Sequence, residues 1–306
     1  MVTAPPRTER GGVVTHDVLF WRYILSVHQR ITFIGPGVMA EAMIAGIIRC
    51  GVAAPEQMTA SGPRINRGRD LSDRYGILSQ TDNIAAVEDA DVVVLCVKPQ
   101  HLKVVFPELA GRIKPSALIL SIIAGATIEK LSHGLQCPNI VRSMPNTPAQ
   151  IGEGITVWTT ASAVSEEQHQ IAQKMLGALG EEIYLAEEYY MDMATALSGT
   201  GPAYVFMFME AMVDAGVHLG FPRRIAEQLV AQTVRGSVDY YRQREHPVHL
   251  ARLRNQVTSP GGTSAAALYY LEKAGFRTAI SRAIWAAYER SQALGKDSQS
   301  QSPDDA

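Results

Sequence analysis

A glycine-rich turn is the first feature of the sequence that could bind a ligand. Residues 31–34 (ITFI) form a β-branched and aromatic run, residues 35–40 read GPGVMA, and a helical pattern of apolar residues follows. In such a Gly-x-Gly-x-x-Ala string Gly35 permits a tight turn, Gly37 lets the backbone approach a pyrophosphate, and Ala40 lets the helix pack close to the strand. The helix N-terminus adds unpaired N–H groups and a positive dipole. Strand, turn and helix together predict a dinucleotide site in preference to a plain strand–helix connection.

The end of the second predicted strand indicates which dinucleotide binds. An NAD-specific site places Asp or Glu there to hold the ribose hydroxyls. This chain instead has residues 61–64 (SGPR) after the strand at residues 58–61, with Arg67 and Arg69 beyond and no acidic residue before Asp70. These cations favour the 2′-phosphate of NADPH. The alternative is a solvated helix face beside a site that also accepts NADH.

Two proline-containing turns close further predicted strands. The turn at residues 97–99 (VKP) ends an apolar run at residues 91–97, and residues 144–148 (MPNTP) end another at residues 139–143. Doubly wound sheets bind ligands at this carboxyl edge. The two prolines stiffen the second turn, which would place Asn146 against the nicotinamide carboxamide or a water. An ordinary structural turn is the alternative.

Two glycine-rich breaks interrupt the helical patterns of the C-terminal part. Residues 197–204 (LSGTGPAY) and residues 258–264 (TSPGGTS) each place hydroxyl groups and free N–H groups at a predicted helix N-terminus. Such groups hold a small carboxylate without a dedicated arginine. Two ordinary interhelical turns are the alternative. No metal site is predicted, because His246 and His249 flank Pro247 and have no acidic partner in step with them.

The elements that must position these residues begin with an α/β domain. Alternating strands and helices over residues 30–188 predict a doubly wound sheet with right-handed crossovers. Strands are expected at residues 31–34, 58–61, 91–97, 118–123, 139–143 and 182–185. Helices are expected from the glycine turn to residue 51 and at residues 65–75, 128–135 and 165–179.

The second domain, residues 189–295, is expected to be entirely helical. Strand signals stop after residue 188, and helices are expected at residues 202–217, 222–244, 263–275 and 277–294. Their wide apolar faces exceed what ~110 residues can bury alone, which predicts a homodimer through this domain. Residues 1–29 form an extension, expected to be disordered, whose role the sequence does not reveal. Residues 296–306 form a polar tail, also expected to be disordered.

Composition excludes several classes of protein. A length of 306 residues with 46% hydrophobic and 19% charged residues is typical of a soluble chain of two domains. A net charge of −2 gives no basic excess for nucleic acid or anionic lipid, and no apolar stretch approaches the ~20 residues of a membrane span. Cys50, Cys96 and Cys137 show no metal or redox spacing. Together with the lack of a signal-peptide pattern, this predicts reduced thiols and a cytoplasmic location.

From residue 31 to about residue 294 the sequence resembles the pyrroline-5-carboxylate reductases. The strings ITFIGPGVMAEAMI, VKP, MPNTP, LSGTGPAYVF and VTSPGGTSAAAL match that family's motifs in order and spacing. The resemblance implies a Rossmann domain followed by an all-α dimerisation domain. It also implies NADPH- or NADH-dependent reduction of the C=N bond of 1-pyrroline-5-carboxylate to L-proline, the last step of proline biosynthesis. The family's site lies between the Rossmann domain and the helical domains of an interlocked dimer, and larger rings of dimers occur.

The resemblance also implies individual contacts. Together with Asn146 from the MPNTP turn, the expected cofactor contacts are Ile34, Gly35, Pro36, Gly37, Val38, Met39, Ser61, Gly62, Arg64, Asn83, Val97, Lys98, Pro99 and Ala124. The expected substrate contacts are Glu188, Ser259, Gly261, Gly262, Thr263 and Ser264. Ser264 stands where many members have threonine, and it is the expected catalytic residue, with its hydroxyl bonded to the imine nitrogen.

The sequence departs from the family in two places. The stretch between Pro247 and Ser259 is about three residues longer than usual. No role is therefore carried over to Glu245, Arg254 or Gln256. The N-terminal extension is also not a family feature.

Hydride transfer to an existing imine depends on orientation and on one hydrogen bond rather than on a strong acid. No histidine therefore has to act. A hydroxyacid or imine dehydrogenase of the same architecture is one alternative. Such enzymes usually place a catalytic lysine or aspartate at the start of the long interdomain helix, where this chain has only the turn at residues 198–202. A non-catalytic NADP-sensing or pyridoxal-phosphate-binding protein is another alternative, and it leaves the SPGGTS element unexplained.

Overall fold

The structure is a computed structural model that describes residues 29–243 and 248–296. It divides the chain into two compact units, Met1–Met191 and Asp192–Ala306. The predictions made for residues 1–28 and 297–306 lie outside the described residues, as do Glu245, His246 and Pro247.

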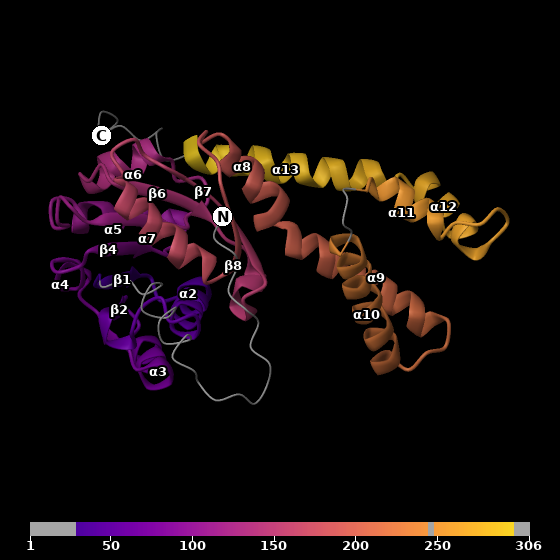
Figure 1. The fold of residues 1–306 in the computed structure, drawn as a ribbon, viewed down its shortest axis with the longest axis horizontal. Coiled ribbons are helices and arrows are strands. Elements are labelled where there is room, and N and C mark those ends of the chain that lie inside the picture. Colours follow the sequence, from indigo (N-terminus) through magenta and orange to yellow (C-terminus); the bar gives the residue numbers. More distant parts are fainter. Residues whose placement is uncertain (1–28, 244–247, 297–306) are drawn as a thin grey trace, which may run out of the picture. The chain divides into compact units, whose positions relative to one another are not determined.

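The first unit is built on one eight-stranded sheet with strand order β3-β2-β1-β4-β5-β6-β7-β8 (Figure 1). Strands β1 to β6 are parallel. Their order is that of a doubly wound dinucleotide-binding sheet, which confirms the predicted fold class. The strands are β1 (Ile31–Ile34), β2 (Met58–Ser61), β3 (Leu78–Gln80), β4 (Val92–Leu95), β5 (Leu118–Ser121), β6 (Ile140–Met144), β7 (Gly154–Thr160) and β8 (Gly180–Tyr184).

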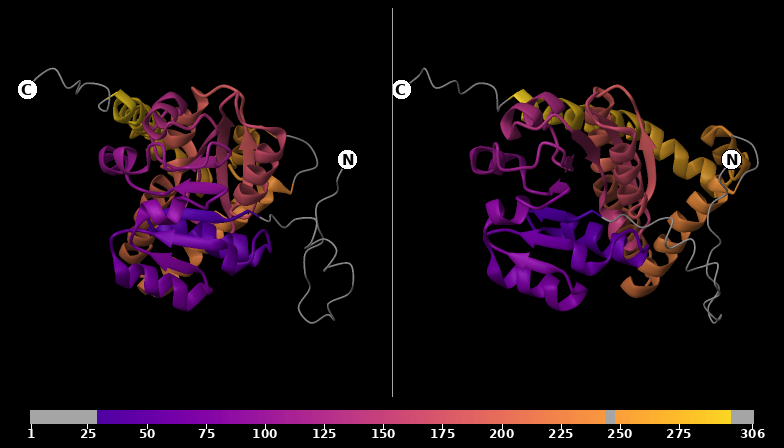
Figure 2. Two further views of the ribbon diagram at one scale, coloured as in Figure 1. Left: turned by 90° about the vertical axis from the view of Figure 1, so that its left-hand side faces the viewer. Right: turned by 60° about the vertical axis from the view of Figure 1, so that its left-hand side comes forward.

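Helices cover both faces of this sheet (Figure 2). On one face Met43 of α2, Leu71 of α3 and Met175 of α7 are fully buried against the strands. On the other, Leu109 of α5 and Leu131 of α6 are equally buried. Cover on both faces explains why the predicted central strands read as continuous apolar runs. The helices are α2 (Val38–Arg49), α3 (Ile65–Tyr75), α4 (Asn83–Val87), α5 (Leu102–Leu109), α6 (Ile128–Leu135) and α7 (Glu166–Gly177), with short 3₁₀ turns η1 (Pro55–Gln57), η2 (Pro99–His101) and η3 (Thr147–Ile151).

The sequence-based expectation missed β3, β7, α4 and α5, and placed the start of the last strand two residues late. Strand β7 runs antiparallel to β6, and β8 pairs parallel with β7. The connection from β6 to β7, residues 145–153, contains only the turn η3. It is too short for the helical crossover that a parallel neighbour needs, so the chain reverses direction.

The second unit is helical throughout its described part, as predicted. Helix α8 (Tyr190–Ala194) leads into it, and α9 and α10 lie side by side around Val213, Ala226 and Val230 (Figure 1). The short helix α11 was not expected from the sequence. The elements are the π-helix η4 (Thr195–Gly199), α9 (Gly201–His218), α10 (Arg223–Arg242), α11 (Leu250–Gln256), α12 (Thr263–Lys273) and α13 (Phe276–Lys296).

The LSGTGPAY segment is not the helix break predicted from its glycines. Residues 195–199 form a π turn that continues directly from α8, and the Thr200 N–H donates to the Thr195 carbonyl five residues back at 2.8 Å. The Ser198 hydroxyl donates to the Ala194 carbonyl and the Thr200 hydroxyl to the Thr195 carbonyl. These hydroxyls therefore satisfy the backbone of the wide turn, which accommodates Pro202 without an N–H, rather than facing a ligand at a free helix end.

Large apolar side chains are exposed along the helices of the second unit. Phe206 is 62% exposed, Met207 74% and Trp285 60%. A single chain leaves too much apolar surface in water here, as the sequence predicted. Among the helices of the described residues, none is long and apolar enough to cross a membrane.

Candidate cofactor and substrate sites

The glycine turn joins the ends of three strands. Gly35 has a φ of +89°, and its N–H donates to the Ser61 carbonyl at the end of β2 at 2.9 Å. A Cβ at Gly35 would lie 2.7 Å from Val97 Cγ1 and 3.0 Å from the Val97 nitrogen. Only glycine satisfies both the backbone angle and this contact. The structure thus brings Gly35, Ser61 and Val97 together, at the point between β1 and β4 where the strand order reverses.

The start of α2 is open to a ligand. Gly37 is the N-cap and its extended backbone carries no side-chain cap, so the first N–H groups of the helix keep their positive potential. A Cβ at Gly37 would have its nearest neighbour, the Gly35 carbonyl oxygen, 4.0 Å away. Gly62 lies against the same turn, since a Cβ there would reach 2.5 Å from Pro36 Cδ. These features form a cradle that fits the pyrophosphate of a dinucleotide.

The side chains of Ser61 and Asn83 form a hydrogen bond at the end of β2. The fully buried Ser61 donates its hydroxyl to Asn83 Oδ1 at 2.7 Å, and Asn83 Nδ2 donates to Glu108 Oε2 at 2.9 Å. Arg64 is different: it is the exposed N-cap residue of α3, and its side chain makes no hydrogen bond or ion pair with the described residues. Of the predicted pair Ser61 and Arg64, Arg64 is the one available to a phosphate.

The turns after β4, β5 and β6 contain the remaining predicted cofactor contacts. Lys98 is the exposed N-cap of η2 and Pro99 its first residue, and Ala124 follows β5 at intermediate exposure. Asn146 is the N-cap of η3, and its Oδ1 accepts the Ile155 N–H at 3.0 Å. This bond fixes the MPNTP turn to β7. It is the structural role that the sequence left open as an alternative.

Glu188 has a partner that sequence reasoning missed. Arg142 on β6 is buried, with its side chain 4% exposed, and its Nη1 lies 2.8 Å from Glu188 Oε1. The same oxygen accepts the N–H of Ile128, the first residue of α6, at 2.8 Å. Charged residues inside a sheet are rare unless paired, so the arginine in the apolar string NIVRS was the available signal.

In the second unit the TSPGGTS segment forms a tight turn before α12. The Gly262 N–H donates to the Ser259 carbonyl at 3.0 Å, and Gly261 has a φ of +72°. Gly262 is the N-cap and Thr263 the first helical residue, so Ser264 is not a helix cap. The hydroxyls of Ser259, Thr263 and Ser264 make no hydrogen bond with the described residues. This helix start therefore keeps the hydroxyl and N–H groups that the prediction assigned to a carboxylate.

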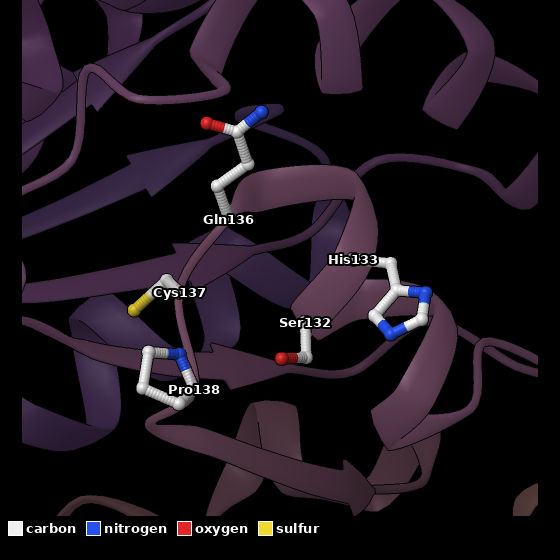
Figure 3. Close-up of a pocket in the computed structure, with 5 residues that line it drawn as sticks. All are labelled: Ser132, His133, Gln136, Cys137 and Pro138. Carbon is white, nitrogen blue, oxygen red and sulfur yellow. The ribbon is translucent and has the colours of Figure 1, made fainter.

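A hollow at the C-terminal end of α6 lies apart from these groups. It has a volume of about 520 Å³ and is lined by Ser132, His133, Gln136, Cys137 and Pro138 (Figure 3). Burial raises the pKa of the Cys137 thiol, and its Sγ lies 3.6 Å from the Ala117 carbonyl. None of the predicted site residues lines this hollow.

The fold and the glycine turn define an NAD(P)-dependent oxidoreductase. Comparison with known proteins agrees: residues 30–125 match the family "NADP oxidoreductase coenzyme F420-dependent", and residues 188–294 match "Pyrroline-5-carboxylate reductase dimerisation". A pyrroline-5-carboxylate reductase from Synechocystis is 40% identical over 267 residues, covering 87% of this chain and 98% of the relative. One from Pseudomonas aeruginosa is 41% identical over 268 residues, covering 87% and 97%.

A solved structure extends the comparison. The Plasmodium falciparum pyrroline carboxylate reductase, crystallised with NADP bound, gives a TM-score of 0.77 at 32% identity and covers 88% of this chain and 99% of its own. The chain belongs to the pyrroline-5-carboxylate reductase family. The family predicted from the sequence motifs is thereby confirmed.

Proposed function

We propose that the chain reduces the C=N bond of 1-pyrroline-5-carboxylate to give L-proline, the final step of proline biosynthesis, with NADPH as the preferred hydride donor and NADH as an alternative. The observation that carries this proposal is the extent of the match, which spans the dinucleotide-binding region and the helical region over 98% of the Synechocystis relative. Residues 30–188 form the cofactor domain and residues 189–295 the dimerisation and substrate domain. The start of the dimerisation match at residue 188 and the division after Met191 support this boundary.

The chain's own residues supply binding and orientation. The N–H groups at the start of α2 hold the pyrophosphate, and Arg64 holds the 2′-phosphate. The hydroxyls of Ser259 and Thr263, with the N–H groups at the start of α12, hold the substrate carboxylate, and Glu188 is a further substrate contact. When bound, the reduced nicotinamide supplies a hydride to the ring carbon of the imine. The imine nitrogen already carries a proton, so no strong acid is needed. Hydride transfer returns a lone pair to this nitrogen, and the Ser264 hydroxyl donates one hydrogen bond to it as the lone pair forms.

The reaction is tested by NADPH oxidation with the purified protein. We expect rapid oxidation with 1-pyrroline-5-carboxylate, and slow oxidation with pyrroline-2-carboxylate and with six-membered cyclic imines. Preference for one of these other imines would redirect the proposal to an imine dehydrogenase of the same architecture. Cofactor binding without turnover of any imine would favour a non-catalytic dinucleotide-binding protein.

Replacement of Arg64 by aspartate is expected to reverse the cofactor preference. Arg64 is a cation at the start of α3 that forms no ion pair within the described part of the chain. A carboxylate at this place repels the 2′-phosphate and accepts hydrogen bonds from ribose hydroxyls. We expect the ratio of the NADPH to the NADH dissociation constant to rise by ~100-fold, from one lost charge-assisted contact and one new repulsion. Calorimetric titration of both cofactors measures it. An unchanged ratio would show that specificity is set elsewhere.

The protein is expected to be at least a homodimer, assembled through the second unit and located in the cytoplasm. The exposed apolar side chains of α9 and α13 and the match to a dimerisation family support the dimer. The three free thiols support a reducing compartment. Sedimentation at micromolar concentration measures the mass. A dimer or a larger ring of dimers agrees with the proposal, whereas a folded, active monomer contradicts it.

A further inference from the structure

The side chain of Arg67 on α3 reaches back to the glycine turn. Its Nε donates to the Pro36 carbonyl at 2.9 Å, and its Nη2 lies 3.5 Å from the Gly37 carbonyl. The same Nη2 forms an ion pair with Glu41 in the first turn of α2. Arg67 and Glu41 are each 22% exposed, so the contact is largely shielded from water. One guanidinium group therefore joins α3, α2 and the backbone of the turn.

The two carbonyls that Arg67 contacts belong to consecutive peptide groups that join the glycine turn to the start of α2. In a trans peptide the carbonyl and the next N–H point in opposite directions. The bond to Pro36 O thus fixes the peptide group whose N–H, that of Gly37, donates to the Gly35 carbonyl at 2.7 Å and closes the turn. The contact to Gly37 O orients the N–H of Val38, the first residue of α2. Neither peptide group can rotate without breaking a contact to Arg67.

The charge of Arg67 is balanced inside this network. Glu41 accepts from Arg67, from Arg74 Nη1 at 2.5 Å and from the Tyr75 hydroxyl at 2.9 Å. Asp70 Oδ2 lies 2.7 Å from Arg67 Nη1 and 2.6 Å from Arg74 Nη2. Partial burial alone would raise the pKa of Glu41, but hydrogen bonds from Arg67, Arg74 and Tyr75 lower it to about 2. The carboxylate is thus ionised at any physiological pH.

We infer that Arg67 is a positioning residue for the cofactor: through its bonds to Pro36 and Gly37 it fixes the glycine turn and orients the N–H at the start of α2 toward the pyrophosphate, and it does not contact the 2′-phosphate. This inference rests on the proposed dinucleotide binding. It corrects the sequence-based interpretation, in which Arg67 was one of the cations favouring NADPH. Because the pyrophosphate is common to both cofactors, the inference predicts equal effects on NADPH and NADH.

The test compares Arg67→Gln with Arg69→Gln in the full chain. Arg69 lies on the same helix, is exposed and makes no ion pair with the described residues, so its replacement removes the same charge without touching the turn. Dissociation constants for NADPH and NADH are measured by calorimetric titration, and melting temperatures by circular dichroism. We expect Arg67→Gln to raise both dissociation constants about tenfold and leave their ratio unchanged. Arg69→Gln is expected to change both constants less than twofold.

Two results would overturn the inference. A loss confined to NADPH would mean that Arg67 contacts the 2′-phosphate, and a lowered melting temperature with unchanged dissociation constants would mean that the network only stabilises the fold. Glu41→Gln covers the case in which Arg67→Gln fails to fold, because it weakens the anchor while the guanidinium remains. It should raise the dissociation constants of both cofactors alike by about threefold. An effect on one cofactor only, or no effect, would equally refute the inference. If the unaltered protein bound neither cofactor, the proposed function itself would fail.

Discussion

Replacement of Ser264 by alanine is expected to lower turnover ~10- to 100-fold while cofactor affinity stays nearly unchanged. The proposed hydrogen bond to the imine nitrogen strengthens as hydride arrives, so its loss, ~1.5–3 kcal/mol, falls on the transition state rather than on ground-state binding. Steady-state kinetics with saturating NADPH measures this directly. Ser264→Thr is the matched control and should be close to wild type, because it keeps the hydroxyl.

The structure sharpens this experiment. Had Ser264 been the helix cap, alanine would have cost about 1 kcal/mol of stability and little turnover. Gly262 is the N-cap instead, so Ser264→Ala should leave the melting temperature within a degree or two of wild type. An alanine variant with normal turnover would remove Ser264 from the proposed mechanism.

Replacement of Glu188 by alanine is expected to destabilise the protein by about 3 kcal/mol. Arg142 is nearly fully buried and would lose its carboxylate partner, and the N–H of Ile128 at the start of α6 would lose its acceptor. Urea unfolding followed by circular dichroism measures the change. We also expect a raised KM for the imine, because Glu188 is a proposed substrate contact.

A double variant separates these two roles of Glu188. In Arg142→Met with Glu188→Leu the buried charge and its partner are removed together, so most of the lost stability should return. The KM for the imine should remain raised. If the double variant regained both stability and substrate affinity, Glu188 would have only a structural role. A single Glu188→Ala variant as stable as wild type would contradict the importance of the ion pair.

The sequence predicted the parts of the structure that depend on local patterns. The glycine turn and strands β1, β2, β4, β5 and β6 were recognisable because each is a short buried run bounded by turn residues. Strand β7 (GITVWTT) was missed although its residues are equally β-branched and buried. Only its antiparallel direction, which depends on the short connection from β6, could not be predicted from its own residues.

The ion pairs at the candidate sites could not be predicted from the sequence, for a related reason. Glu41 and Arg67 are 26 residues apart, and Arg142 and Glu188 are 46 apart. Each pair exists only because the sheet brings distant segments together, and no periodicity marks one arginine over its neighbours. The motif LSGTGPAY was recognised, but its predicted conformation was wrong, because its glycine and proline residues are compatible with both a π turn and a helix break.

The π turn also sets the helical phase of α9, which continues directly from it. It holds one more residue than an α-helical turn, and one residue corresponds to ~100° of rotation about a helix axis. The exposed side chains of Phe206 and Met207 thus face a direction fixed by residues 195–199 and not by α9 itself. Deletion of a single residue there would rotate Glu210 and Asp214 by the same angle. The length of this segment is therefore constrained by the orientation of a surface further along the chain.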